Sequence, residues 1–322
     1  MPGFAHWRTA ACEPLTGDAS ARKYFRLRAK NQTAILMDAA QVPYSLAPFI
    51  RLANHLRQIG FSAPEILARD AESGLLLLED FGDDTFAKLM ENNLQIGNKL
   101  NPVAGRNWES LLTLATEVLI ALHQHPKAVP ENLRAYEPEK MLEDVELFAQ
   151  WRTPNLSAMA KDDFRAAWRA VLPMAQRVPE SLLLRDYHVA NLMLLPERAG
   201  IQQAGLLDFQ DAYRGPVTYD LVSLLEDARR DVPPDLQEKM TSRYLAAFPA
   251  LDRKAFETSW AVIAAQRHMR VLGIFERLAR HEGKLDYRRR HSPRVERRLR
   301  RALQHPVLAD LKTWIERHAT TD

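Results

Sequence analysis

The chain has 322 residues, of which 46% are hydrophobic and 26% charged, and its formal net charge is +3. This length exceeds what one small core needs, so we expect two lobes, and the small net charge favours neither a nucleic-acid nor a membrane partner. The single cysteine, Cys12, excludes an internal disulfide and fits a reducing compartment. No apolar run approaches the roughly 20 residues of a membrane span, and the first residues lack a signal-peptide core, so we expect a soluble cytoplasmic protein.

The N-terminal part is predicted to form strands and one helix. Short runs of aromatic and aliphatic residues at 23–29 and 33–39 predict the two strands of a hairpin. Hydrophobic residues then recur at helical spacing over 45–60, and Gly60 is a suitable C-terminal stop. The sequence "GLLLLEDFGDD" at 74–84 predicts a buried strand that runs into a turn.

From about residue 84 the pattern becomes helical. Helices are predicted at 107–125, 137–151, 162–176, 220–229 and 257–281. The exceptions are the stretches 182–195 and 205–212, which together predict one small hairpin. The fold class is therefore α+β, with a β-rich N-terminal part and a mostly helical remainder.

The stretch 288–301 holds eight arginines, a density that is typical of nucleic-acid binding. However, Ser292 and Pro293 form a helix-start signal. Beyond them, apolar residues repeat at every fourth position: Val295, Leu299 and Leu303. We therefore predict an amphipathic helix that docks its apolar stripe and points its arginines into solvent.

The motif "LRDYHVAN" at 184–191 brings Asp186 and Asn191 close together in sequence, and Asp208 follows at the end of an apolar run. Phosphoryl transfer needs a carboxylate that orients or deprotonates the attacking hydroxyl, and hard oxygen ligands that hold Mg²⁺ against the phosphates. The order D-x-x-x-x-N, then D-F, matches the kinase catalytic loop and metal motif. The alternative is structural, because Asp and Asn in loops also cap helices and make turns.

With these motifs, the segments "GDASARKYFRL", "AILMDA", "LLDFQDAYRGPVTYDLVSLLEDA" and "QRHMRVLGIFERLARHEGK" make the chain resemble the aminoglycoside-phosphotransferase superfamily of small-molecule kinases. The last segment and "FQDAYRGPVTYDL" resemble the bacterial anomeric kinases of N-acetylmuramate and N-acetylglucosamine in cell-wall recycling. The resemblance implies a protein-kinase-like two-lobe fold, with a nucleotide-binding lobe at 1–80 and a helical catalytic and substrate lobe at 81–322. It also implies ATP, Mg²⁺ and a small sugar substrate, without an obligate protein partner.

Matched residue by residue, the resemblance implies that Asp186 is the catalytic base and that Asn191 and Asp208 are the Mg²⁺ ligands. Asp220 matches an Asp that braces the catalytic loop in such folds. His188 lies within that loop, where we expect a structural or substrate-facing role.

For the nucleotide, the resemblance points to the turn that contains Ser20 and to the hinge backbone around Glu79 and Phe81. Met37 stands near the position of the phosphate-pairing Lys of protein kinases, and the helix predicted at 45–60 has no Glu to pair with such a Lys. Positive charge is therefore expected from the strand after the turn, at Arg22, Lys23 and Arg26. The alternative is that these three residues form a solvated strand face.

For the acceptor, we expect contacts from His188, Asp211, Arg267 and Arg270. Arg267, Arg270 and Arg277 are predicted to share a helical face, where guanidiniums suit the carboxylate of muramic acid. The alternative is internal pairing with acidic residues.

The expected function leaves two further alternatives. One is a kinase for an aminoglycoside, choline or another sugar. The other is a nucleotide-binding pseudokinase, which is suggested by Met37 and by Leu184, since Leu184 stands where the family usually has His.

Overall fold

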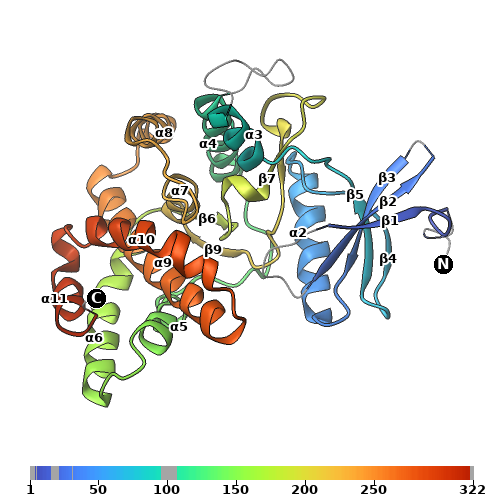
Figure 1. The fold of residues 1–322 in the computed structure, drawn as a ribbon. Helices are drawn as coiled ribbons and strands as arrows, with labels where there is room; N and C mark the ends of the chain where they lie inside the picture. Colours follow the sequence, from blue (N-terminus) through green and yellow to red (C-terminus); the bar gives the residue numbers. More distant parts are fainter. Residues whose placement is uncertain (1–3, 5, 16–21, 31, 96–106, 320–322) are drawn as a thin grey trace. The chain divides into compact units, whose positions relative to one another are not determined.

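The computed structural model describes residues 4, 6–15, 22–30, 32–95 and 107–319 (Figure 1). By contacts between Cα atoms, the chain divides into two compact units. Unit 1 comprises residues 1–130 and 189–212, and unit 2 comprises residues 131–188 and 213–322. The functional boundary predicted after residue 80 stays a prediction.

Unit 1 contains a five-stranded sheet with the strand order β1-β2-β3-β5-β4, in which all neighbours are antiparallel. The strands are β1 (Ala11–Leu15), β2 (Lys23–Ala29), β3 (Gln32–Asp38), β4 (Ile66–Asp70) and β5 (Leu75–Glu79). β2 and β3 are the predicted hairpin, and β5 is the predicted buried strand. β1 and β4 were not predicted. They are the two edge strands, and β1 is exposed along nearly its whole length, so its sequence lacks the alternation that marks a half-buried strand.

The predicted helix after this hairpin is present as the short 3₁₀ turn η1 (Pro43–Ser45) and α2 (Leu46–Gln58). Its buried residues recur at spacings of three and four and form one face: Leu46, Phe49, Leu52, Ala53 and Leu56. Gly60 has φ +91°, a left-handed conformation that glycine adopts at little cost, and the helix ends just before it as predicted.

The other described elements of unit 1 are helices, helical turns and the two strands of one hairpin. Its elements are α3 (Phe86–Gln95), α4 (Trp108–Gln124), the 3₁₀ turns η3 (Val189–Asn191) and η4 (Gly200–Gln203), β7 (Leu192–Leu194) and β8 (Ala204–Leu206). β7 pairs with β8, which confirms the predicted hairpin for these two segments. The backbone N–H of Leu206 donates to the carbonyl of Ser62 at 2.7 Å, so the hairpin is also bonded to the chain that follows α2.

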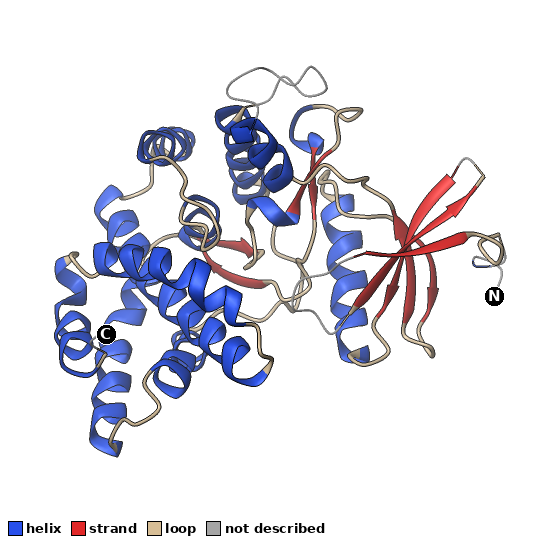
Figure 2. Cartoon of the chain, in the orientation of Figure 1, coloured by secondary structure: helices blue, strands red, loops and turns tan. Residues whose placement is uncertain are grey.

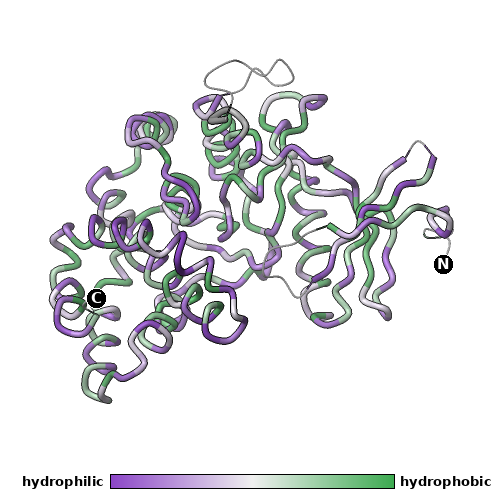
Figure 3. The backbone as a smooth tube through the Cα atoms, viewed as in Figure 1, coloured by the Kyte–Doolittle hydropathy of each residue, from purple (hydrophilic) through white to green (hydrophobic). Residues whose placement is uncertain are grey.

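Unit 2 is mainly helical, and its described residues contain one two-stranded sheet (Figure 2). Its elements are α5 (Pro138–Leu147), the π-helical turn η2 (Phe148–Arg152), α6 (Ala158–Ala175), β6 (Glu180–Leu183), β9 (Tyr213–Pro216), α7 (Thr218–Leu225), α8 (Pro234–Ala247), α9 (Arg253–His281), α10 (Leu285–Ala302), η5 (Pro306–Leu308) and α11 (Ala309–His318). α9 contacts α5, α6, α7 and α10 and forms the centre of the hydrophobic core. Hydrophobic and hydrophilic residues alternate along these helices (Figure 3), as expected for helices that pack on one face.

Two predictions about unit 2 are wrong in part. The strand before the catalytic motif, β6, does not join the β7–β8 hairpin but pairs with β9. The helix expected to start at Ser292-Pro293 starts at Leu285 and contains Pro293. The stripe of Val295, Leu299 and Leu303 is buried as predicted, but Arg298 is buried too and donates to the carbonyls of Asp227 and Arg230.

Within the described part of the chain, none of the helices is both long enough and apolar enough to cross a membrane.

Candidate active site

The loop that follows β6 is fixed by Asp220 of α7. The carboxylate of Asp220 accepts the backbone N–H of Leu184 at 2.5 Å and that of Arg185 at 2.8 Å. Arg185 has φ +73°, a left-handed conformation that costs a residue with a Cβ on the order of 1–2 kcal/mol. Burial raises the pKa of Asp220 to about 7, against the lowering effect of the two backbone donors. The two hydrogen bonds of Asp220 are the contacts expected of a residue that braces the loop.

Asp186, the predicted base, is the next residue of this loop and is partly buried. Burial alone would raise its pKa, but the positive charges of Arg270 and Arg267, with a smaller contribution from Arg185, hold the pKa of Asp186 below its ordinary value. Its backbone N–H donates to the carbonyl of Leu184 at 2.9 Å. An ionised carboxylate in a braced loop is suited to accept a hydrogen bond from a hydroxyl group.

Asp144 of α5 is the carboxylate that holds two of these arginines. It is buried, and it pairs with Arg185 and with Nε of Arg270 at 3.6 Å. The hydroxyl of Tyr136 donates to Oδ2 of Asp144 at 2.8 Å, and Nζ of Lys140 lies 3.1 Å from Oδ1. Burial would raise the pKa of Asp144, but the charges of Arg185 and Arg270 lower it.

Arg185 also lies against two aromatic rings. Its guanidinium carbon is 5.7 Å from the ring centre of Tyr136 and 5.4 Å from that of Tyr213. Contacts of this kind stabilise a cation by about 0.5–2 kcal/mol. The side chain of Arg185 is thus fixed by Asp144 and two tyrosines, while its backbone is fixed by Asp220.

The arginines predicted on one face of α9 do not share one environment. Arg267 is 3% exposed and donates from Nη2 to Oγ of Ser223 at 2.6 Å, and Arg270 pairs with Asp144. Arg277 is exposed to solvent. The alternative, that these arginines pair internally with acidic residues, therefore applies to Arg270. By contrast, Nε and Nη1 of Arg267 are buried without a hydrogen-bond partner among the described residues.

His188 is buried, and its Nε2 lies 3.3 Å from Nη1 of Arg229. Because an arginine can only donate, this geometry requires Nε2 to accept. Burial lowers the pKa of His188 to about 4. The ring is therefore neutral at pH 7, which agrees with a structural or substrate-facing role.

The two predicted metal ligands come together in unit 1. Asn191 ends η3, and its carbonyl accepts the backbone N–H of Leu207 at 3.0 Å, just before Asp208. Nδ2 of Asn191 lies 3.5 Å from Oδ2 of Asp208. Asp208 has φ +58°, and the next residue, Phe209, stacks on Phe49 of α2 with 5.2 Å between ring centres. The buried Phe209 thus anchors the backbone that presents Asp208.

Asp208 carries two further contacts. Oδ1 accepts from Nε2 of Gln210 at 2.9 Å and lies 3.5 Å from Nη2 of Arg22. The side chain of Asp208 is 46% exposed, so it is accessible to a ligand.

This arrangement fits Mg²⁺. A carboxylate and an amide are hard oxygen donors, and a half-turn of the Asn191 side-chain amide presents its oxygen toward Asp208. Among the described residues, no group of three or more His, Cys, Asp or Glu side chains forms a metal site. Asp208 and Asn191 are the residues that would hold Mg²⁺.

The predicted hinge after β5 is held by Arg26 of β2. The guanidinium of Arg26 contacts Asp80 at 2.7 and 2.9 Å, Asp83 at 2.8 Å and the carbonyl of Gly82 at 2.8 Å. Arg26 is also buried, and its charge is balanced by the carboxylates of Asp80 and Asp83. The residue fixes the hinge turn, and a direct contact between Arg26 and the nucleotide stays a prediction.

The other hinge residues are held by Arg198, which follows β7. Arg198 pairs with Glu79, and its guanidinium carbon lies 5.2 Å from the ring centre of Phe81. On Gly205 of β8, an added Cβ would lie 2.7 Å from the Phe81 ring, so the ring packs directly on the glycine backbone. Glu79 also lies 3.5 Å from Nη1 of Arg57.

The remaining predicted residues are placed less closely. Lys23 is exposed at the start of β2, where it lies opposite Asp38 of β3. Asp211 is also exposed, and its Oδ2 lies 3.4 Å from Nε2 of Gln210. Ser20 lies outside the described residues. Met37 is fully buried in β3, so an apolar side chain does occupy that position.

Sequence reasoning missed the roles of Asp144 and Arg198. Asp144 lies 126 residues before Arg270, and Arg198 lies 119 residues after Glu79. No spacing rule connects residues that lie so far apart in the sequence. The only hint in the sequence is that Asp144 and Arg198 are charged and therefore need partners if the fold buries them.

A five-stranded antiparallel sheet followed by a mostly helical C-terminal part is the architecture of small-molecule kinases with the protein-kinase-like fold, and Asp186, Asn191 and Asp208 follow one another in the order of the kinase motifs. The model of the phosphotransferase enzyme family matches residues 11–256, and the chain belongs to this family. The expected fold and the expected class of enzyme, a phosphotransferase with a hydroxyl acceptor, are confirmed.

Two curated relatives carry the same name, N-acetylmuramate/N-acetylglucosamine kinase. The protein from Caulobacter vibrioides is 33% identical over 350 residues, which cover 96% of this chain and 92% of the relative. The protein from Pseudomonas aeruginosa is 31% identical over 321 residues, which cover 96% of this chain and 89% of the relative.

Solved structures support the fold. A choline/ethanolamine kinase family protein from Mesorhizobium loti matches with a TM-score of 0.63 and 16% identity, over 98% of this chain and 96% of that chain. The GDP complex of wild-type aminoglycoside 2'-phosphotransferase-IIIa matches with a TM-score of 0.60 and 13% identity, over 90% of this chain and 93% of that chain.

Proposed function

We propose that this enzyme uses ATP and Mg²⁺ to phosphorylate the anomeric hydroxyl of N-acetylmuramate and N-acetylglucosamine. The observation that carries the proposal is the ionised Asp186, presented by a loop that Asp220 and Asp144 fix from two sides. The names of the two relatives supply the acceptor. Cell-wall recycling would be the matching physiological role.

In the proposed reaction, Asp186 accepts a hydrogen bond from the sugar hydroxyl and takes its proton as the oxygen attacks the γ-phosphorus of ATP. The new O–P bond forms while the bond to the β-phosphate oxygen breaks, and ADP leaves. Asn191 and Asp208 would hold Mg²⁺, which offsets the negative charge of the phosphates when bound. Because catalysis of this kind rests mainly on positioning and charge, the low pKa of Asp186 is compatible with its role.

For the nucleotide, we propose that residues 1–80 bind ATP and that residues 81–322 carry the chemistry and the sugar. The hinge backbone around Glu79 and Phe81 would receive the adenine. Ser20 and Lys23 would contact the phosphates, and Arg26 would act through the hinge turn that it fixes.

For the acidic sugar, we propose that Arg267 contacts the lactyl carboxylate of N-acetylmuramate, with Arg270, His188 and Asp211 as further acceptor contacts. The buried Nε and Nη1 atoms of Arg267, which lack partners among the described residues, support this assignment. The charge of a guanidinium also suits a carboxylate.

The test of the reaction is ADP release in the presence of each sugar. Turnover is expected with N-acetylmuramate and N-acetylglucosamine, together with loss of the reducing end of the product. The matched control is the methyl glycoside of N-acetylglucosamine, which lacks an anomeric hydroxyl and should not be phosphorylated. Equal turnover of the glycoside would refute the anomeric position. Turnover only with choline or an aminoglycoside would refute the sugar, and no turnover with any acceptor would indicate a pseudokinase.

The test of the Arg267 assignment compares two substrates. Arg267→Ala should raise the KM for N-acetylmuramate by about 10–100-fold, since hydrogen bonds to a charged group contribute about 1.5–3 kcal/mol. The KM for N-acetylglucosamine, which has no lactyl carboxylate, should change much less. Equal changes for both sugars would instead indicate a structural role at Ser223.

A further inference from the structure

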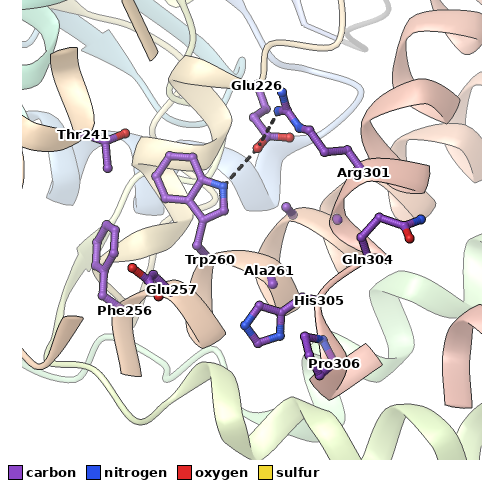
Figure 4. Close-up of a pocket in the computed structure, with 12 residues that line it drawn as sticks. Glu226, Thr241, Phe256, Glu257, Trp260, Ala261, Arg301, Gln304, His305 and Pro306 are labelled. Atoms are coloured by element: carbon purple, nitrogen blue, oxygen red, sulfur yellow. Dashed lines mark hydrogen bonds and ion pairs between the residues drawn. The ribbon is translucent and has the colours of Figure 1, made fainter. Parts of the chain in front are cut away.

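Unit 2 contains a pocket that the proposed reaction does not use. Its volume is about 530 Å³, within the range of about 300–1,000 Å³ that is usual for small-molecule sites (Figure 4). It is lined by Glu226 after α7, by Thr241 of α8, by residues of α9 and by the chain from the end of α10 to Pro306. No residue predicted for catalysis, metal or acceptor binding lines it.

The walls of the pocket are largely apolar. α9 contributes Phe256 and Trp260, which are labelled in Figure 4 together with Pro306 on the opposite chain segment. Three alanines complete the apolar lining: Ala261, Ala264 and Ala302. Such walls favour the hydrophobic part of a ligand, and the two rings can also lie against a cation.

Glu226 supplies a buried negative charge. Its side chain is 5% exposed, and it accepts from Nε1 of Trp260 at 3.0 Å and pairs with Nε2 of His268 at 2.7 Å. Burial alone would raise the pKa of Glu226, but the contact with His268 and the charge of Arg301 lower it to about 2. Glu226 is therefore ionised at neutral pH.

Arg301 is a charged partner of Glu226 that comes from the surface. Its guanidinium lies 3.1 Å from Oε1 of Glu226, as drawn in Figure 4, but the side chain is 53% exposed. The exposed Arg301 side chain loses conformational entropy when it is held in this pair, so a ligand cation that offers Glu226 an equivalent charge can take its place. Glu226 would still keep its contacts with Trp260 and His268.

The charges of the lining favour a cation. Two carboxylates, Glu226 and Glu257, face one arginine, Arg301, so an anionic ligand would meet net negative charge once Arg301 moves. We propose that this pocket binds an organic cation, an alkylammonium or guanidinium group on a hydrophobic body. The cation takes the place of the Arg301 guanidinium at Glu226, and the body packs on Trp260 and Phe256. The proposal rests on unit 2 alone and is independent of the proposed reaction.

The experiment measures binding of 2-phenylethylamine by calorimetry or ligand-observed NMR, with neutral 2-phenylethanol as the matched probe. Arg301→Ala removes the internal competitor and should tighten amine binding by about fivefold, the equivalent of about 1 kcal/mol. Arg300→Ala, the neighbouring exposed arginine that lies 4.0 Å from Glu296, is the control and should leave binding unchanged. Kinase activity of Arg301→Ala should equal that of the wild type, which reports a folded protein.

Glu226→Gln should abolish the preference for the amine over the alcohol, and Trp260→Leu should weaken both probes. Because Glu226→Gln also disturbs the buried pair with His268, the measurement on Arg301→Ala is the decisive test. If Arg301→Ala binds the amine no more tightly than the wild type, or if the alcohol binds as well as the amine, the proposal is wrong.

Discussion

Asp144→Asn is the substitution that probes the fixed catalytic loop most sharply. The side chain of Asp144 is 8% exposed, and its partners Arg185 and Arg270 are 11% and 14% exposed. Removing one partner of a buried ion pair costs about 3–5 kcal/mol, because the remaining charge is left unpaired. The contact with Lys140, which is 35% exposed, adds at most about 1 kcal/mol. We therefore expect the free energy of unfolding to fall by about 3–5 kcal/mol.

The same substitution should lower kcat. Arg185 precedes Asp186, and a displacement of about 1 Å in a catalytic group costs on the order of 100-fold in rate, so kcat should fall by about 10–100-fold. The KM for ATP should stay within about twofold, because the ion-pair partners of Asp144 among the described residues, which are Lys140, Arg185 and Arg270, are not predicted to bind the nucleotide.

Glu143→Gln is the matched control for Asp144→Asn. It removes one carboxylate from the same helix, but that side chain is 66% exposed and pairs only with Lys140 among the described residues. Urea unfolding and steady-state kinetics on both variants measure the two effects. If Asp144→Asn destabilises the protein no more than Glu143→Gln, by less than about 1 kcal/mol, the reasoning about the buried pair is refuted.

Three further predictions concern other parts of the two units. Asp220→Ala leaves the buried backbone N–H of Leu184 and the partly buried N–H of Arg185 without their acceptor. Urea unfolding should show a loss of about 2–6 kcal/mol, and an unchanged midpoint would contradict the bracing role. Gly205→Ala places a Cβ 2.7 Å from the Phe81 ring. This overpacking should raise the KM for ATP several-fold, while kcat at saturating ATP should change less. An unchanged KM for ATP would show that Phe81 does not contribute to nucleotide binding. Glu226 has a pKa lowered to about 2, so its contribution to stability is present above its ordinary value of 4.5 and is lost as pH falls from 4.5 to 2. Denaturation between pH 6 and pH 3 should therefore show a smaller pH-dependent loss of stability for Glu226→Gln than for the wild type, and parallel losses would contradict this.

The sequence predicts the local parts of the fold well, and the reason is periodicity. α2 has its buried residues at helical spacing, and the helix ends just before Gly60, as predicted. The pair predicted to hold the metal is also a prediction from sequence, because kinase chemistry calls for an Asn and an Asp in this order. The structure brings Asn191 and Asp208 within 3.5 Å of one another.

Partners that are distant in sequence are not predictable in this way. β6 is a short strand, and nothing in its composition selects β9 rather than the β7–β8 hairpin, which is nearer in sequence, as its partner. Asp144 is one of many acidic residues on amphipathic helices, and only the packing of α5 beside α9 gives it two buried arginines. Pairing of this kind depends on the tertiary structure.

The start of α10 shows how tertiary packing overrides a local signal. Ser292-Pro293 is a good start signal, yet the helix begins at Leu285. Residues of its first turns pack on α9: the Tyr287 and His291 rings lie 5.6 Å and 5.9 Å from the Phe275 ring. These ring contacts stabilise helical structure in the residues before Pro293, although Pro293 itself has no N–H to donate.

The role of Asp186 is the central claim, and the rate of ADP release by Asp186→Asn with N-acetylmuramate or N-acetylglucosamine tests it most directly. Asparagine keeps the shape of the side chain but cannot accept the proton, so kcat should fall by about 100–10,000-fold, the usual contribution of a general base. ATP binding and thermal stability should stay close to those of the wild type. A variant that retains more than about one tenth of the wild-type kcat would contradict the assignment of Asp186 as the catalytic base.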